Sequence, residues 1–186
     1  MEDSEKDLRP TLLTTRLILR PFQLSDAATV QRLAGHPKVA ATTALIPHPY
    51  LDGLAEEWIG KHIGWFARGA ALTLAIALKP SGELIGCISL GVSKDNSRAE
   101  LGYWLGVEHW NKGYCSEAAK EIVRYGFEQM NLNKITSRHM NINPASGRVM
   151  VKIGMKKEGT LRQEIHKDGT FHDLEVYGLI RKDFIC

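Results

Sequence analysis

Residues 99–119, with the sequence AELGYWLGVEHWNKGYCSEAA, constrain the fold most, because their pattern predicts a strand, a glycine-containing turn and then a helix. Behind the turn, apolar side chains recur with the spacing of one buried helical face at Ala119, Ile122, Val123, Gly126, Phe127 and Met130. We therefore expect a helix over about 116–130. The first turn of a helix carries backbone N–H groups without internal partners and a partial positive charge. This turn therefore predicts a site for a phosphate or diphosphate group.

The residue types in the turn fit such a site. Gly113 lets a ligand approach the backbone closely, Ser116 is placed to cap the helix with its hydroxyl, and Glu117 suits the first helical turn. The segment contains neither the P-loop pattern nor the GxGxxG pattern of dinucleotide-binding folds. An ordinary strand-to-helix connection that contains a glycine is the alternative.

Composition and charge indicate one folded domain. The 186 residues are 44% hydrophobic and 24% charged, which are ordinary globular values. The formal net charge is only +3 and the basic residues are scattered, so we expect no nucleic-acid partner. No apolar segment suits a signal peptide or a membrane span, so we expect no membrane partner. Residues 1–11 are predicted to form a flexible tail, and residues 12–186 a single domain.

The cysteines and histidines show no metal-binding pattern. Cys87, Cys115 and Cys186 lie far apart without CxxC spacing, which is typical of reduced thiols in a cytoplasmic protein. The seven histidines show neither HExxH nor paired Cys/His spacing, so we expect surface or site-lining side chains and no metal.

Hydropathy predicts a mixed α/β or α+β domain. Alternation predicts strands over about 16–22, 72–78, 84–92, 99–105, 134–142, 155–166 and 171–180, with Asp168-Gly169 as a hairpin turn. Helical spacing predicts further helices over about 25–35, 51–67 and 143–154. The segment 36–50 contains three prolines and is predicted to be a loop. Hairpin-like links indicate a single, mostly antiparallel sheet flanked by helices.

Three motifs in order resemble the GNAT acetyltransferases, in particular the branch of ribosomal-protein N-terminal acetyltransferases. They are LTTRLILRPFQLSD at 13–26, the segment 99–119, and NINPASGRVMVKIGMKKEG at 141–159. The resemblance extends over about 14–184. It implies the GNAT acyl-CoA N-acyltransferase fold, acetyl-coenzyme A (acetyl-CoA) as the acetyl donor, and a primary amine as the acceptor. That amine is a protein N-terminal α-amine or a small molecule.

The resemblance also implies positions for the cofactor. The loop that holds the diphosphate of acetyl-CoA is formed by Trp110, Asn111, Lys112, Gly113, Tyr114, Cys115 and Ser116. The pantetheine arm lies beside the strand 100–105, which includes Trp104 and Leu105. Asn143 contacts the same arm in the family, although its position also suits a helix N-cap that needs no ligand.

Two residues are candidates for catalysis. Glu100 matches the strand carboxylate that serves as general base in relatives, while an ion pair with a base on a neighbouring strand is the alternative. Ser146 matches a serine that lies near the coenzyme A thiol in the ribosomal-protein branch. The alternative is that its hydroxyl caps a backbone amide of the helix. The tyrosine acid of many relatives is replaced by Met150. A second glutamate of the branch falls at Ile165, and Glu164 would face away unless a bulge shifts the register.

The resemblance favours direct acetyl transfer within a ternary complex. A nucleophilic Cys115 is the alternative route, because helix N-termini lower thiol pKa values. A non-catalytic acyl-CoA sensor or a protein-interaction module on the same fold are the other functional classes, and a homodimer is left open. His48, Tyr50, Trp58 and Trp65 are candidates for an acceptor pocket, with Trp58 also suited to the core.

Overall fold

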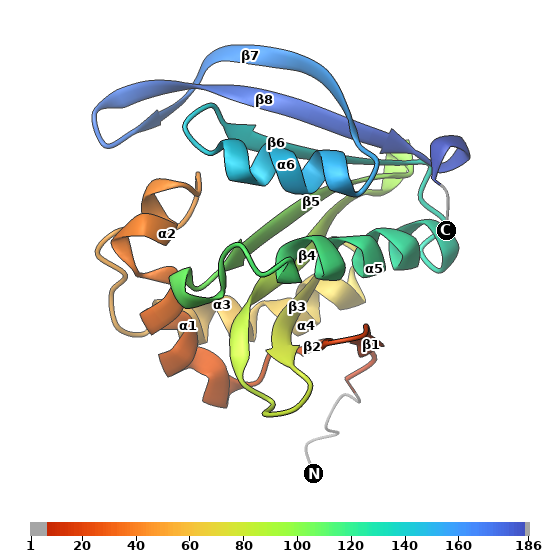
Figure 1. The fold of residues 1–186 in the computed structure, drawn as a ribbon. Helices are drawn as coiled ribbons and strands as arrows, with labels where there is room; N and C mark the ends of the chain where they lie inside the picture. Colours follow the sequence, from red (N-terminus) through yellow and green to blue (C-terminus); the bar gives the residue numbers. More distant parts are fainter. Residues whose placement is uncertain (1–6, 185–186) are drawn as a thin grey trace.

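One eight-stranded sheet organises the chain, for which the computed structural model describes residues 7–184 (Figure 1). The strands follow the order β1-β2-β3-β4-β5-β6-β8-β7, and every neighbouring pair is antiparallel except β5 and β6. Their bounds are β1 (Leu12–Leu13), β2 (Leu17–Pro21), β3 (Ala71–Leu78), β4 (Leu84–Ser93), β5 (Arg98–Leu105), β6 (Lys134–Met140), β7 (Lys156–Lys167) and β8 (Thr170–Ile180). The predicted mixed, mostly antiparallel sheet is confirmed.

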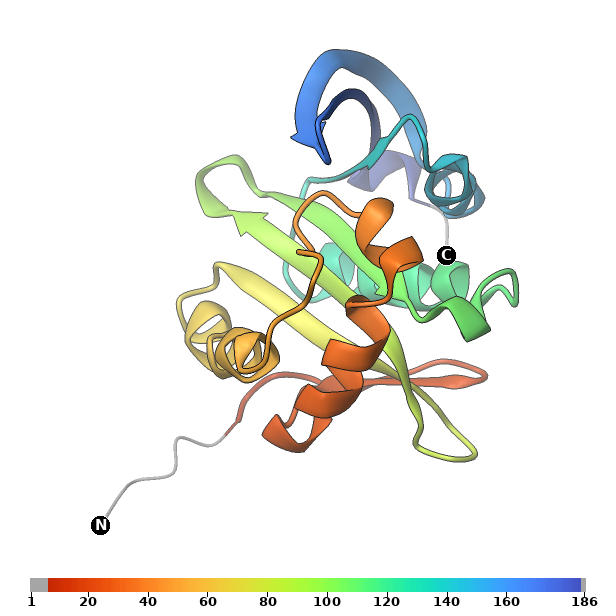
Figure 2. The same ribbon diagram turned by 90° about the vertical axis from the view of Figure 1, so that its left-hand side faces the viewer.

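Helices cover both faces of this sheet. They are α1 (Ala27–Ala34), α2 (Pro37–Ala41), α3 (Leu54–Gly60), α4 (His62–Ala67), α5 (Tyr114–Glu128) and α6 (Pro144–Lys152). Figures 1 and 2 show α5 and α6 on one face and the N-terminal helices on the other. A large apolar cluster fills the space under α5, and a smaller one lies between α1, α3 and the opposite face of the sheet.

The parallel strands β5 and β6 separate after a short pairing. Only Arg98, Ala99 and Glu100 pair with β6, where their partners are residues 134–136. Beyond that point the Ser137 hydroxyl donates to the carbonyl of Leu101, over 2.8 Å. The two strands then diverge (Figure 1), and the N-terminus of α6 lies near the opening. This divergence creates space in the middle of the sheet.

Helices in three parts of the chain differ from those that the spacing of apolar residues predicts, and their local sequences explain why. The segment 36–50 is not all loop: it contains α2, because Pro37 occupies the first helical turn and the His36 ring accepts from the N–H of Lys38. The single helix predicted over 51–67 is two helices that meet at Lys61. Helix α5 begins two residues before Ser116, so the predicted Ser116 cap is wrong and Gly113 is the N-cap.

Two terminal features bear on the predictions. Residues 1–6 of the predicted tail lie outside the described residues, and residues 7–11 form no helix or strand. The Arg9 side chain is nevertheless 7% exposed and pairs with Asp7. At the other end, Asp168 and Gly169 have positive φ angles of 49° and 77°, as the predicted hairpin turn between β7 and β8 requires.

Membrane and metal signals are absent from the described ranges. None of the helices within residues 7–184 has the length and apolar character needed to cross a bilayer. The same residues hold no group of three or more Cys, His, Asp or Glu side chains that could bind a metal ion.

Candidate active site

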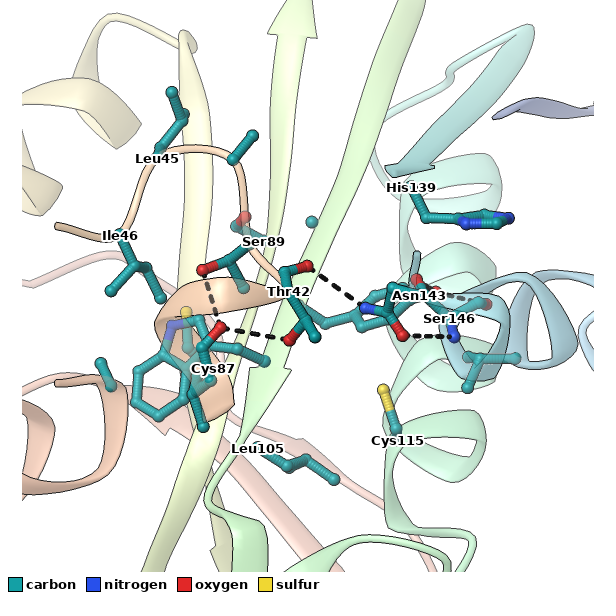
Figure 3. Close-up of a pocket in the computed structure, with 18 of the residues that line it drawn as sticks. Thr42, Leu45, Ile46, Cys87, Ser89, Leu105, Cys115, His139, Asn143 and Ser146 are labelled. Atoms are coloured by element: carbon teal, nitrogen blue, oxygen red, sulfur yellow. Dashed lines mark hydrogen bonds between the residues drawn. The ribbon is translucent and has the colours of Figure 1, made fainter. Parts of the chain in front are cut away.

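A cleft of about 950 Å³ opens where β5 and β6 diverge (Figure 3). Its walls come from α1 to α4, from β4 to β6, from the N-terminus of α5, from α6, and from single residues of β7 and β8. The structure brings nearly all of the predicted site residues to this cleft, namely Glu100, Trp104, Leu105, Trp110, Asn111, Gly113, Tyr114, Cys115, Ser116, Asn143 and Ser146. Lys112 is the exception, because it does not line the cleft.

The glycine loop, residues 110–113, leads into α5, and together they present free backbone donors to the cleft. Asn111 and Gly113 adopt positive φ angles of 59° and 80°, so the chain turns sharply before α5. Gly113 has no side chain to cap the helix. Within residues 7–184, the backbone N–H groups of residues 113–116 find no acceptor. Together with the positive end of α5, these N–H groups form a site suited to an anion.

Cys115 has a protonated thiol. Figure 3 shows its sulfur at the cleft, one residue into α5. Burial raises the pKa of Cys115 to about 12, which outweighs the usual effect of a helix N-terminus. A nucleophilic thiolate at this position is therefore disfavoured.

The N-terminus of α6 places a pair of hydroxyl groups at the cleft. Tyr103 Oη lies 2.9 Å from Ser146 Oγ and donates to the Ser146 carbonyl over 3.0 Å. Burial, the largest cause, raises the pKa of Tyr103, so its phenol stays protonated at neutral pH. Sequence reasoning missed Tyr103, because its partner lies 43 residues further along the chain.

Asn143 is the N-cap of α6, as its position suggested. Its Oδ1 accepts from the N–H of Ser146 over 3.3 Å, and its Nδ2 donates to the carbonyl of Thr42 over 3.2 Å (Figure 3). The side chain therefore joins α6 to the residues that follow α2. The Ser146 hydroxyl caps no backbone group among residues 7–184 and instead lies 2.9 Å from Tyr103 Oη, where either hydroxyl can donate.

Glu100 is paired across the sheet. Its two carboxylate oxygens accept from Nε and Nη2 of Arg138 on β6, both over 2.9 Å. The side chains of Glu100 and Arg138 are 46% and 40% exposed, and both line the cleft. The ion pair expected from the alternative interpretation is thus confirmed. Strand alternation directs Glu100 to the face opposite Tyr103.

The second glutamate found in ribosomal-protein N-terminal acetyltransferases has no counterpart in this cleft. Strand β7 does bulge: three residues, 162–164, stand opposite the single Asp173, whose carboxylate accepts from the N–H of Gln163 over 2.8 Å. Even so, Ile165 is the β7 residue that lines the cleft, and Glu164 is exposed outside it.

Three of the four candidates for an acceptor pocket lie at the cleft. Tyr50, Trp58 and Trp65 line the cleft, whereas the His48 ring contacts the carbonyl of Gly35 at 3.1 Å instead. The 42–47 loop closes this side of the cleft. Lys167 on β7 holds that loop, because its Nζ donates to the carbonyls of Thr43 and Ile46 over 2.7 and 3.1 Å.

Comparisons with known proteins agree with this architecture. Residues 16–156 match the Acetyltransferase (GNAT) domain family. The chain is similar to the N-acetyltransferase p20 of Bacillus licheniformis, with 31% identity over 175 residues that cover 94% of this chain and 98% of p20. A GNAT-family acetyltransferase from Bacillus anthracis superposes with a TM-score of 0.82 at 26% identity, over 93% of this chain and 99% of that chain.

A further solved structure shares the fold. RimL, a ribosomal L7/L12 alpha-N-protein acetyltransferase in complex with coenzyme A, has a TM-score of 0.82 at 20% identity, over 92% of this chain and 98% of its own. The sheet, the cleft and the family match define the class of the protein: the chain belongs to the GNAT family of acetyltransferases. It is an acetyl-CoA-dependent N-acetyltransferase.

Proposed function

We propose that this enzyme moves the acetyl group directly from acetyl-CoA to a primary amine, with both substrates in the cleft at once. The observation that carries the proposal is the set of free N–H groups at residues 113–116, which open onto the same cleft as Tyr103, Ser146 and Glu100. In the proposed complex these N–H groups and the end of α5 bind the diphosphate of acetyl-CoA. The bound coenzyme A of RimL supports this choice of ligand.

The pantetheine arm is proposed to lie in the gap between β5 and β6. The carbonyls of Ala99 and Leu101 accept from side chains of β6, so these residues turn their backbone groups toward that strand. Alternation directs the backbone N–H and C=O of Tyr103 the same way, where β6 has already diverged. An extended arm with amide groups can pair with these free backbone groups as an added strand would.

Transfer requires a proton for the departing thiolate. The amine nitrogen attacks the thioester carbonyl, a tetrahedral intermediate forms, and the C–S bond then breaks. Ser146 and Tyr103 form a protonated, hydrogen-bonded pair at this end of the cleft. We assign the proton donation to Ser146, with Tyr103 replacing the proton through their mutual hydrogen bond.

The amine must also lose a proton. We assign this proton to Glu100, which pairs with Arg138 and lies on the opposite face of the sheet from Tyr103. Because Glu100 is half exposed, the proton passes through a water molecule. An α-amine, whose ordinary pKa is about 8, is more readily neutral near pH 7 than a lysine-like amine of about 10.4, so its proton is easier to remove. An α-amine, which a protein N-terminus provides, is therefore the preferred kind of acceptor, ahead of lysine-like amines.

Initial-rate kinetics and mass spectrometry test direct transfer together. Varying acetyl-CoA against a peptide with a free N-terminus should give intersecting double-reciprocal lines, and the enzyme mixed with acetyl-CoA alone should keep its mass. Parallel lines, with an acetylated enzyme detected before the amine is added, would overturn the ternary-complex proposal. A panel of peptides, polyamines and amino acids in the same assay ranks the acceptor classes.

A further inference from the structure

Arg16, the residue before β2, is the centre of a network that reaches the glycine loop from outside the cleft. Its Nε donates to Glu117 over 2.7 Å, its Nη1 donates to the Lys112 carbonyl over 3.0 Å, and its guanidinium lies 4.5 Å from the centre of the Tyr114 ring. The backbone N–H of Arg16 and the hydroxyl of Thr14 also donate to Glu117, over 2.7 and 2.6 Å. One side chain thus contacts the loop, the first residue of α5 and an acidic residue of its first turns.

The contact with Lys112 fixes the direction of a neighbouring N–H. The carbonyl of Lys112 and the N–H of Gly113 belong to one planar trans peptide group, so they point in opposite directions. Lys112 and Arg16 do not line the cleft, whereas Gly113 and Tyr114 do. A carbonyl held by Arg16 on the outer side therefore directs the Gly113 N–H inward, toward the cleft.

Glu117 completes the arrangement by turning away from the helix end. Burial opposes its charge, but hydrogen bonds from Thr14 and Arg16 outweigh burial and hold the pKa of Glu117 below its ordinary value. A carboxylate in the first turns of a helix commonly competes for the free N–H groups. Here the carboxylate is bound to Arg16 and Thr14, so the N–H groups of residues 113–116 stay free.

We infer that Arg16 is a positioning residue for acetyl-CoA, acting through Lys112 and Glu117 to orient the N–H groups that receive the diphosphate. The inference rests on the proposed place of the diphosphate in the glycine loop. Arg16 acts through the loop rather than as a cation that attracts the phosphates. Positioning predicts weaker acetyl-CoA binding in both Arg16→Lys and Glu117→Ala, whereas a charge role predicts no change in the first and tighter binding in the second.

The experiment compares Arg16→Lys, Arg16→Ala and Glu117→Ala with the wild type. Arg16→Lys keeps the charge but replaces the planar fork, whose Nε and Nη1 reach Glu117 and Lys112 separately, by one ammonium nitrogen on a flexible chain. Glu117→Ala removes a negative charge and so would tighten anion binding if charge alone mattered. Arg124→Ala is the matched control, because Arg124 also pairs with carboxylates of α5, at Glu121 and Glu128, without touching the loop.

Steady-state parameters are measured with acetyl-CoA and with acetyl-pantetheine, which lacks the diphosphate, at a temperature where thermal melts show each variant folded. We expect all three network variants to raise KM for acetyl-CoA about tenfold, with little change in kcat. Their kcat/KM for acetyl-pantetheine should match that of the wild type. Arg124→Ala should resemble the wild type with both donors.

The outcomes separate the positioning role from the site itself. An Arg16→Lys enzyme with wild-type KM, or tighter acetyl-CoA binding in Glu117→Ala, would overturn the positioning role. An equal loss with both donors would show a merely structural role and would overturn it too. If wild-type enzyme used acetyl-CoA no better than acetyl-pantetheine, the proposed diphosphate site itself would fail.

Discussion

His62 shows how much a single side chain can depend on its surroundings. It is 1% exposed, lies against the rings of Phe22, Trp58 and Trp65, and neither ring nitrogen has a hydrogen-bond partner among the described residues. Burial, assisted by the charge of Arg9, lowers the pKa of His62 to about 4. The imidazole is therefore neutral in the folded protein. This finding corrects the prediction that all seven histidines lie on the surface or in the site.

A pH dependence of stability follows from this burial. The unfolded chain binds a proton at His62 below its ordinary pKa of about 6.5, whereas the folded chain binds it only near 4. The stability contributed by neutral His62 is thus present above about pH 6.5 and is lost as the pH falls toward 4. Urea unfolding measures the free energy of unfolding at pH 7 and at pH 5. This free energy should fall by about 2 kcal/mol more in the wild type than in His62→Phe. Equal losses in the two proteins would contradict a neutral buried His62.

The hydroxyl pair at the cleft gives a second prediction at this scale. Tyr103→Phe should lower kcat about tenfold, and the double variant with Ser146→Ala about a hundredfold, because both remove the proton for the thiolate. KM for acetyl-CoA should stay within about twofold. Tyr177→Phe is the control, since Tyr177 contacts His139 and lies outside the cleft. A double variant with wild-type kcat, under conditions where chemistry limits the rate, would refute the assignment.

Predictions for single residues were correct where the residue's place depends only on its neighbours in the sequence. The helical spacing behind Gly113 and the Asn143 cap are properties of short segments, and the structure agrees with both. Tyr103 and Arg138 could not be found in this way, because their partners come from distant strands and helices. Glu100 was identified by its neighbours in the motif, but its ion pair depends on sheet order.

At the scale of elements, the hairpin of β7 and β8 reaches across the cleft to the N-terminal part of the chain. Lys167 near its tip holds two carbonyls of the 42–47 loop, and Asn143 holds a third. The loop therefore depends on contacts from both sides of the opening. Sequence predicted the hairpin from Asp168-Gly169, but α2 within 36–50 was missed, because five helical residues give too few turns for a period.

Lys167→Met tests this contact between elements. Removing two hydrogen bonds from a charged donor should loosen the 42–47 loop and raise KM for the amine acceptor about tenfold. KM for acetyl-CoA should stay near the wild-type value, because the glycine loop lies elsewhere. Lys156→Met, an exposed lysine of the same strand that pairs with Asp183, is the control. An unchanged acceptor KM would show that Lys167 does not shape the acceptor side.

For the whole molecule, the divergence of β5 and β6 is the central feature. Three residue pairs join these strands, and the cleft separates β1 to β5 from β6 to β8 beyond them. The antiparallel run from β3 to β5 and the hairpin of β7 and β8 were predicted from their turns, whereas the position of β8 between β6 and β7 was not, because it joins strands far apart in the sequence. The point where β5 and β6 separate could not be predicted from the sequence. It depends on how far two parallel strands remain paired, and no local pattern contains that information.

A ligand that spans this divergence should stabilise the entire fold. Acetyl-CoA at about a hundred times its dissociation constant should raise the free energy of unfolding by about 2.7 kcal/mol. Adenosine and free pantetheine, each only part of the ligand, should produce smaller shifts in the thermal midpoint. An absence of any shift at millimolar acetyl-CoA would contradict acetyl-CoA binding in the cleft.

Amide NMR of ¹⁵N-labelled protein during an acetyl-CoA titration tests the central claim most directly. If the diphosphate lies at the glycine loop, the amide protons of residues 113–116 should shift downfield with acetyl-CoA and with ADP, but not with pantetheine. Amides near the C-terminal end of α5 should stay in place. Shifts concentrated elsewhere, with residues 113–116 unchanged at saturation, would contradict the claim that these N–H groups hold the acetyl donor.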